Sequence, residues 1–115
     1  MDQEVLKYIE AIPPEHRHLF DRVHRMILEA CPEVEVVLSY KMPTYQMGDR
    51  RLHLAAWNHG VSIYGWKPQG DGGFTLRHPE CWTSTGTIRL RTDHEATIAD
   101  EEIRELARAT LTPPT

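Results

Sequence analysis

The sequence predicts a single α+β domain, with helices packed on one face of a mainly antiparallel sheet. Three observations predict this class. Apolar residues recur at helical spacing in both terminal parts, period-two alternation dominates the middle, and a short turn joins two of the alternating segments. A chain of 115 residues has the length of one domain. We therefore expect N-terminal helices and a C-terminal helix around central strands.

Two helices are expected before the strands. The first is short, begins after Asp2 as its cap, and has Val5, Leu6 and Ile9 on one side. The second runs from about Pro14 to Ala30, because proline suits the first turn of a helix. Its apolar stripe consists of Leu19, Phe20, Val23, Met26, Ile27 and Ala30.

Four segments alternate in the manner of strands, namely residues 34–39, 51–57, 61–66 and 87–91. The turn Asn58-His59-Gly60 joins the second to the third as a β-hairpin. We expect Gly60 to supply the positive φ that a short hairpin loop needs.

The chain after the hairpin is less regular. Residues 68–73 are expected to form a loop, and Pro79 argues against regular structure in residues 74–84. A last helix is expected from Ile98 or Asp100 to Leu111. Its stripe consists of Ile103, Leu106, Ala107 and Thr110.

The stretch SYKMPTYQMGD, residues 39–49, separates two predicted strands. Pro43 keeps Met42 out of the helical region, so the segment is expected to be extended. Met42 and Met47 suit the edge of a core, because their side chains are adaptable. A packed corner with a snorkelling lysine and the wall of a binding pocket are both open interpretations for Tyr40, Lys41 and Tyr45.

Charge is distributed unevenly along the chain. Residues 41–91 carry seven Lys/Arg and three Asp/Glu, a net charge of +4, whereas residues 1–40 and 92–115 each carry a net charge of −4. Parity places aromatic and basic side chains on the sheet face away from the helices. The predicted face consists of His53, Trp57, Ser62, Tyr64, Trp66, Thr87, Arg89 and Arg91. Such a face suits self-association or a small anionic or aromatic ligand.

Several classes of protein have no support in the sequence. There is no GxSxG, P-loop, GxGxxG or HExxH motif, so an enzyme is not predicted. Nucleic acid is not an expected partner, because the net charge is negative and no RNP motif occurs. Cys31 and Cys81 are expected to be free thiols, and nothing orients Cys81 with His78 as a reactive pair.

The location expected from the sequence is the cytoplasm. No apolar run reaches the length of a membrane span, so no membrane partner is predicted. The N-terminal stretch MDQEVLKYIE has acidic residues where a signal peptide has basic ones.

The ordered motifs of the chain resemble those of one family. SYKMPTY resembles the YxMPxY-type signature of the YdhG-like (DUF1801) family, and LHLAAWNHGVSIYGW resembles that family's strand, histidine-containing turn and strand. TSTGTIRLRTD and the acidic helix after it resemble the family's C-terminal strand and helix. The resemblance covers nearly the whole chain. Thr85 stands where the family often has lysine, and residues 67–84 are glycine-rich where relatives tend to be helical.

The resemblance implies a non-catalytic intracellular binding or carrier protein. Most members are uncharacterised, and one branch is described as a frataxin-like iron chaperone. Weak, transient iron binding of that kind uses surface carboxylates. The candidates here are Glu101, Glu102 and Glu105, whose alternative role is to cap and solubilise the last helix.

The alternative function is a small-ligand-binding or self-assembly module that uses the aromatic and basic sheet face. His59 belongs to its candidate site, because the resemblance places a histidine in that turn; its other interpretation is a turn residue bonded to local backbone. The full candidate set for ligand binding is Lys41, Met42, Pro43, Tyr45, Trp57, His59, Tyr64 and Arg89.

Overall fold

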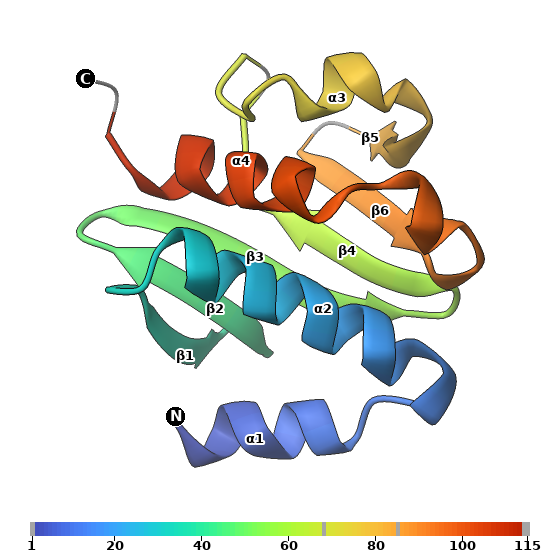
Figure 1. Cartoon of the computed structure of the whole chain (residues 1–115). Coiled ribbons are helices and arrows are strands. Elements are labelled where there is room, and N and C mark those ends of the chain that lie inside the picture. Colours follow the sequence, from blue (N-terminus) through green and yellow to red (C-terminus); the bar gives the residue numbers. More distant parts are fainter. Residues whose placement is uncertain (1, 68, 85, 114–115) are drawn as a thin grey trace.

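The computed structural model describes residues 2–67, 69–84 and 86–113 and confirms the α+β class. Residue 68 of the predicted loop and Thr85 lie outside the described residues. The elements form a six-stranded antiparallel sheet of order β1-β2-β3-β4-β6-β5 with α2 and α4 lying across it (Figure 1). In chain order they are α1 (Gln3–Glu10), α2 (Pro14–Ala30), β1 (Glu35–Ser39), β2 (Met42–Met47), β3 (Arg50–Trp57), β4 (Gly60–Tyr64), α3 (Phe74–Arg77), the 3-10 turn η1 (Pro79–Cys81), β5 (Trp82–Ser84), β6 (Thr87–Arg91), the 3-10 segment η2 (Thr92–Thr97) and α4 (Asp100–Leu111).

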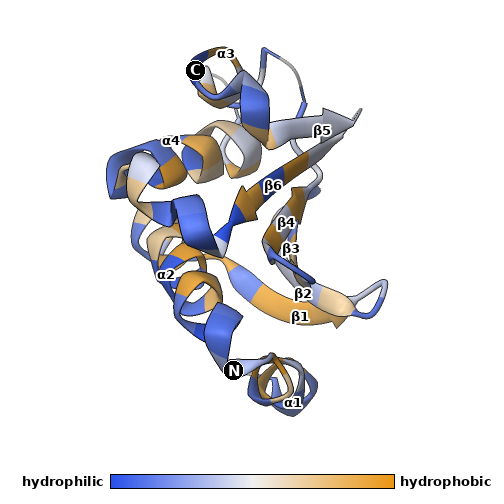
Figure 2. Cartoon of the chain, turned by 90° about the vertical axis from the view of Figure 1, so that its right-hand side faces the viewer, coloured by the Kyte–Doolittle hydropathy of each residue, from blue (hydrophilic) through white to orange (hydrophobic). Residues whose placement is uncertain are grey.

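The helices occupy the predicted segments. The Asp2 carboxylate caps α1 by accepting the Glu4 N–H at 2.9 Å. Helix α2 has the predicted bounds, and α4 begins at Asp100, the later of its two predicted starts. Figure 2 shows α2 and α4 together on one side of the sheet. No helix among the described residues is long and apolar enough to cross a membrane.

The expectation that Pro43 keeps residues 39–49 extended is confirmed for Met42–Met47, which forms a further strand, β2, that the sequence did not predict. Tyr40 and Lys41 form the two-residue turn between β1 and β2, with φ of +52° and +62°. Positive φ at both central residues matches the twist of the flanking strands in a type I′ hairpin. Asparagine or glycine usually supplies these values, so the Tyr-Lys pair gave no hairpin signal in the sequence.

Pro43 limits how far β2 pairs with β3. The pairing runs from Met47–Arg50 to Thr44–His53 and then stops. Hydrogen-bonded pairs alternate along an antiparallel ladder, and the next one would require an N–H that Pro43 lacks. Beyond β2, the Ala56 N–H of β3 donates instead to the Tyr8 hydroxyl of α1 at 2.9 Å. Helix α1 thereby supplies a hydrogen-bond acceptor to the part of β3 that does not pair with β2.

Gly60 is required for a different reason from the one the sequence suggested. Its φ is not positive; a Cβ at this position would lie 1.9 Å from the Leu90 carbonyl oxygen of β6. The two-residue turn Asn58-His59 closes the hairpin, and Gly60 already belongs to β4. The glycine therefore permits the close approach of β4 and β6.

Trp66 is another correction, because it is 3% exposed rather than part of the open sheet face. Gly65, with φ of +96°, ends the regular alternation of β4 and redirects the chain. The Trp66 Nε1–H donates to the Ile63 carbonyl at 3.1 Å. A tryptophan with its N–H satisfied in this way can join the core.

Residues 74–84 contain short elements where irregular structure was expected. The buried Asp71 carboxylate accepts the N–H groups of Gly73 and Thr75, at 3.0 and 2.9 Å, and so orders the entry to α3. Strand β5 then pairs with β6 only through Trp82 and Ser84. Among the residues that the structure describes, residues 89–91 of β6 therefore have no strand partner on that side.

Gly60→Ala is expected to lower the free energy of unfolding by about 3 kcal/mol, because the new methyl group would separate β4 from β6. Denaturant unfolding measures this loss. Gly48→Ala is the control: its site has open space but φ of +59°, so a loss of about 1 kcal/mol is expected. Equal losses in the two variants would contradict the steric role of Gly60.

Lys41→Gly is expected to raise the free energy of unfolding by about 1 kcal/mol, because glycine adopts the left-handed conformation without a steric penalty. Thermal and denaturant unfolding measure this gain. Lys41→Ala removes the same charge and keeps the penalty, so no gain is expected. If both variants gained equally, the lysine charge rather than the backbone would be responsible.

Candidate functional site

Two of the predicted ligand-binding residues lie in the core. Pro43 and Tyr45 are buried, and Tyr45 is 0% exposed. The Tyr45 hydroxyl shares a 2.7 Å hydrogen bond with Nδ1 of His24 on α2, which joins β2 to the helix layer. Burial, and then the nearby Asp21 carboxylate, raise the pKa of Tyr45. These contacts assign Tyr45 to packing rather than to the surface of a pocket.

Lys41 and Met42 are adjacent in the chain, and Tyr64 is on β4, which β3 separates from β2. Lys41 is exposed in the β1–β2 turn, and Met42 begins β2 on the sheet face away from α2. Tyr64 lies at the end of β4, directly opposite His53 of β3. The structure does not bring these three residues into one site with the remaining candidates.

Trp57, His59 and Arg89 do come together, on the sheet face away from the helices. The Arg89 guanidinium carbon lies 4.6 Å from the Trp57 ring centroid, and the His59 ring meets Trp57 edge-on at 5.0 Å between centroids. We call these three residues the Trp57 cluster. Within the described part of the chain, Arg89 has no carboxylate partner and the buried Trp57 Nε1 has no hydrogen-bond acceptor.

The acidic candidates of α4 are engaged by cations. Glu101 and Glu105 both pair with Arg108, and the pKa of Glu105 is lowered by that hydrogen bond. Glu102 accepts the Arg77 Nε–H at 3.1 Å and lies 2.5 Å from His78 Nε2. No group of three metal-ligating side chains occurs among residues 2–67, 69–84 and 86–113. A metal ion on α4 would have to displace these partners.

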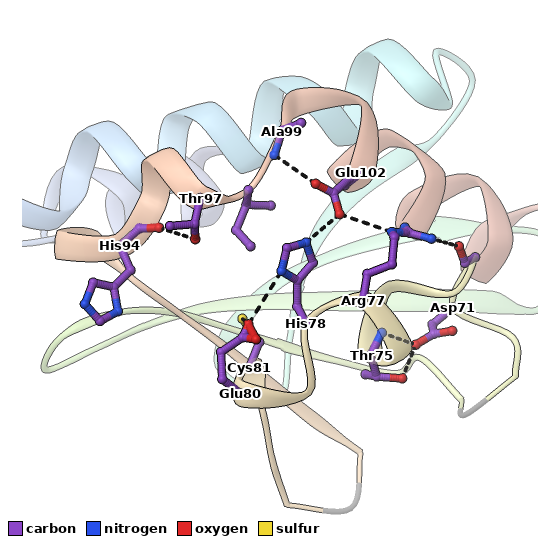
Figure 3. Close-up of polar contacts among 12 residues, drawn as sticks. Asp71, Thr75, Arg77, His78, Glu80, Cys81, His94, Thr97, Ala99 and Glu102 are labelled. Carbon is purple, nitrogen blue, oxygen red and sulfur yellow. Dashed lines mark hydrogen bonds and ion pairs between the residues drawn. The ribbon is translucent and has the colours of Figure 1, made fainter.

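An apolar hollow lies along the unpaired end of β6, between α2, η1 and η2. It has a volume of about 400 Å³, and we call it the β6 cleft. Leu19, Cys81, Leu90 and Ile98 are buried apolar residues that form its floor. The remaining lining residues are polar or charged: Arg22, Glu80, Arg89, Arg91, His94, Glu95 and Thr97. Figure 3 shows His94 and Thr97 on one side and Glu80 and Cys81 on the other.

Arg22 fixes the wall of the cleft that η2 provides. Its Nε–H donates to the Asp100 carboxylate at 2.6 Å, and its other nitrogens donate to the carbonyl oxygens of Glu95 and Ile98. The hydrogen bond from Arg22 lowers the pKa of Asp100. Since η2 has no buried residue of its own, this side chain holds it against α2.

Cys81 and His78 lie near each other but do not form a nucleophile and base (Figure 3). His78 Nε2 faces Glu102, and Nδ1 lies 3.5 Å from Glu80. The Cys81 thiol is directed at Glu80, 3.8 Å from its carboxylate. Burial, and then the Glu80 charge, raise the pKa of Cys81 to about 11. At neutral pH the sulfur is therefore a protonated, apolar part of the cleft floor.

A larger and more polar hollow lies beside the C-terminal end of α4. Three of its four Lys/Arg side chains already have partners: Arg108 pairs with acids of α4, while Arg50 and Arg51 donate to the carbonyl oxygens of Thr110 and Asp49. The β6 cleft has the stronger combination of apolar floor and polar rim, so we take it as the candidate site.

Sequence reasoning identified Arg89 but missed the rest of this cleft. Its walls come from α2, from η1 and from η2, which are separated by up to 79 positions between Leu19 and Ile98. The polar segment TDHEAT between the last strand and last helix has no periodicity. This segment lies between a strand and a helix that the sequence predicts, and loops that join such elements often carry functional residues.

Comparison of the chain with models of protein families, with curated proteins and with solved structures found no match. Function is therefore inferred from the geometry of the described residues.

Cys81 is expected to react with iodoacetamide at least about 100-fold more slowly than free cysteine at pH 8, because a pKa near 11 leaves little thiolate. The rate should continue to rise with pH toward about 11. Mass spectrometry of a Cys31→Ala protein measures Cys81 alone. Glu80→Gln should accelerate the reaction at pH 8 by removing a negative charge. A rate close to that of free cysteine would indicate an activated thiol.

Proposed function

We propose that this chain is a non-catalytic binding protein that holds a small organic ligand in the β6 cleft. One observation carries the proposal: a hollow of about 400 Å³ combines a buried apolar floor with charged side chains at its rim. Ligand sites in proteins commonly have volumes of about 300–1,000 Å³ and this division between apolar lining and a few polar groups.

The side chains of the cleft favour binding over chemistry. The Cys81 thiol is protonated at neutral pH, and both ring nitrogens of His78 face carboxylates. The Thr97 hydroxyl donates to the His94 carbonyl at 2.8 Å, with no base beside it in the described residues. Activation of a hydroxyl or thiol nucleophile requires an adjacent base or a lowered pKa. These groups can therefore position a ligand but are not arranged to attack one.

The apolar floor sets the strength that such binding can reach. Burying a CH₂ group contributes about 0.8 kcal/mol, so a body of five carbons contributes about 4 kcal/mol. The polar rim adds to this, while lost rotational and translational freedom opposes it. We expect dissociation constants in the micromolar to millimolar range, which suits a carrier that exchanges its ligand.

The resemblance to the YdhG-like family supports a carrier role in a general way, since its described branch delivers iron rather than transforming a substrate. Iron itself receives less support from the acids of α4, because Glu101, Glu102 and Glu105 are paired with Arg or His. The Trp57 cluster lies on the opposite face of the sheet from the cleft, so the alternative of a ligand-binding sheet face is a separate site.

Thr97→Trp is expected to abolish ligand binding, because an indole on the rim would fill the cleft. Two-dimensional NMR with a panel of small organic acids, amines and amino acids would detect binding through shifts of the amides of Cys81, Leu90 and Ile98. Thr83→Trp, on the exposed face of β5 and outside the cleft, is the matched control and should leave binding unchanged. Shifts confined to Trp57 and His59, or binding that survives in Thr97→Trp, would overturn this site.

A further inference from the structure

We infer that a second copy of this chain pairs with β1, so that two molecules form one continuous antiparallel sheet. The inference concerns assembly and goes beyond the proposed function, because β1 forms one edge of the sheet and β6 lies next to the opposite edge (Figure 1). It is carried by the free edge of β1, whose residues complement one another when two copies meet antiparallel.

Strand β1 directs the backbone groups of Val36 and Leu38 away from the sheet. The two-residue turn after β1 makes Ser39–Met42 the closing hydrogen-bonded pair, and such pairs alternate along an antiparallel ladder. Every second residue counted back from Ser39 therefore bonds to β2, and the residues between them face outward. Within the described ranges, no group bonds to the backbone of Val36 or Leu38 on that side.

Helix α1 packs beside this strand without closing its edge. Tyr8 of α1 lies against Phe20 of α2, with 6.1 Å between ring centroids, so α1 contacts β1 and β2 from the helix layer. The hydrogen bond from the sheet to Tyr8 comes from Ala56 of β3 rather than from β1. Val36 and Leu38 are only half-buried although they share a sheet face with the helices, so they can receive a further apolar surface.

The two edges of the sheet are protected differently. Strand β5 has three residues and an irregular register against β6, and short or irregular edges discourage further pairing. Strand β1 pairs with β2 in regular register over five residues and contains no lysine, proline or bulge. A regular, apolar edge of this kind is suited to the addition of another strand.

Two copies of β1 match when Val37 lies on the twofold axis. Val36 of one copy then exchanges both of its backbone hydrogen bonds with Leu38 of the other, and the symmetry repeats this pair. The same register places the apolar side chains of Val36 and Leu38 together on the helix side of the sheet. On the open side, the half-buried Val37 side chains of the two copies face each other. The pairing therefore satisfies backbone groups and buries apolar surface on both faces.

The polar residues around this axis are complementary as well. Glu35 lies opposite the Ser39 hydroxyl of the second copy, and beyond the strand ends the exposed Glu33 lies opposite the exposed Lys41. Opposite charges and hydrogen-bonding groups across two strands stabilise an antiparallel pair. A shift of the axis by one residue toward the N-terminus would place Glu35 opposite a valine instead. The charges thus select the register that the backbone groups favour.

The mass of the protein in solution tests this pairing. One added edge is a small interface, so we expect a reversible dimer over about 10 to 500 µM, where sedimentation should show the mass rising from 13.3 kDa toward twice that value. Val37→Lys places two ammonium groups opposite each other and should weaken the dimer at least about tenfold. Because Val37 lies on the sheet face without helices, circular dichroism should show an unchanged fold. Thr83→Lys, on the exposed strand β5, is the matched control and should leave the dimer unchanged.

Charge reversal tests the register without changing the strand itself. Glu33→Lys and Lys41→Glu should each weaken the dimer, because each places like charges opposite one another across the interface. The variant that carries both substitutions should recover the affinity of the natural sequence. Two weakening effects that simply add in the double variant would contradict this register.

A disulfide locates the twofold axis directly. Two Val37 residues in a pair without backbone hydrogen bonds have Cα atoms about 4.5 Å apart, which is within the range of a disulfide. Val37→Cys should therefore give covalent dimers under air oxidation, detected by non-reducing electrophoresis. Ser39→Cys is the control, because its two copies would be about 13 Å apart. The natural cysteines, Cys31 and Cys81, are buried and present in both variants.

Three results would overturn the inference: a mass of 13.3 kDa at every concentration, equal cross-linking of the two cysteine variants, or a dimer that survives Val37→Lys. A dimer that is lost in Trp57→Ala but kept in Val37→Lys would place the contact on the open sheet face instead. None of these measurements involves the β6 cleft, so the pairing of β1 and the proposed function stand or fall separately.

Discussion

The arrangement of the cleft depends on Arg22, which joins α2 to the chain on both sides of Ile98. Its side chain is 15% exposed and combines an ion pair to Asp100 with donation to two carbonyl oxygens. Charge-assisted hydrogen bonds of this kind are stronger than neutral ones and fix direction as well as distance. Because η2 contributes no buried residue, its position against α2 follows from Arg22 and from Ile98, which is 4% exposed. Arg22 therefore contributes both to the α2–α4 contact and to the wall of the candidate site.

The sheet determines where this wall can enclose space. Pairing stops at two places where a strand cannot continue: Pro43 ends the β2–β3 ladder, and β5 reaches β6 only as far as Ile88. At the first place, the Tyr8 hydroxyl of α1 accepts a hydrogen bond from the free Ala56 N–H of β3. At the second place the described part of the chain supplies no further strand, and the unpaired end of β6 borders the cleft. An edge that is neither paired nor covered is exposed to partners, so the ligand that we propose for the cleft would also cover this edge of the sheet.

The elements that sequence reasoning predicted well are those whose pattern is local. Helix α2 has the predicted bounds, because its apolar stripe and the prolines at its ends are all local to that segment. The arginines of β6 point away from the helices, as the alternation of the strand predicts. The failures have non-local causes. Strand β2 was hidden because Tyr40 and Lys41 adopt positive φ without an Asn-Gly signal, and Gly60 is needed for contact with Leu90 thirty residues later. The cleft could not be assembled from the sequence, because no local pattern relates Leu19 to Cys81 or Ile98.

The polar groups that the fold leaves without partners do not by themselves mark the proposed site. Leaving a buried donor or acceptor unpaired costs about 1–3 kcal/mol, and natural proteins keep few such groups. Among the described residues, four side-chain atoms are of this kind, namely Arg17 Nε, Trp57 Nε1, Glu95 Oε2 and Thr110 Oγ1. Of these residues, Glu95 lines the cleft, whereas Trp57 packs under Arg89 on the sheet face away from the helices. Because the unpaired atoms are spread over the molecule, the proposal of the β6 cleft depends on its buried apolar floor and polar rim rather than on these atoms.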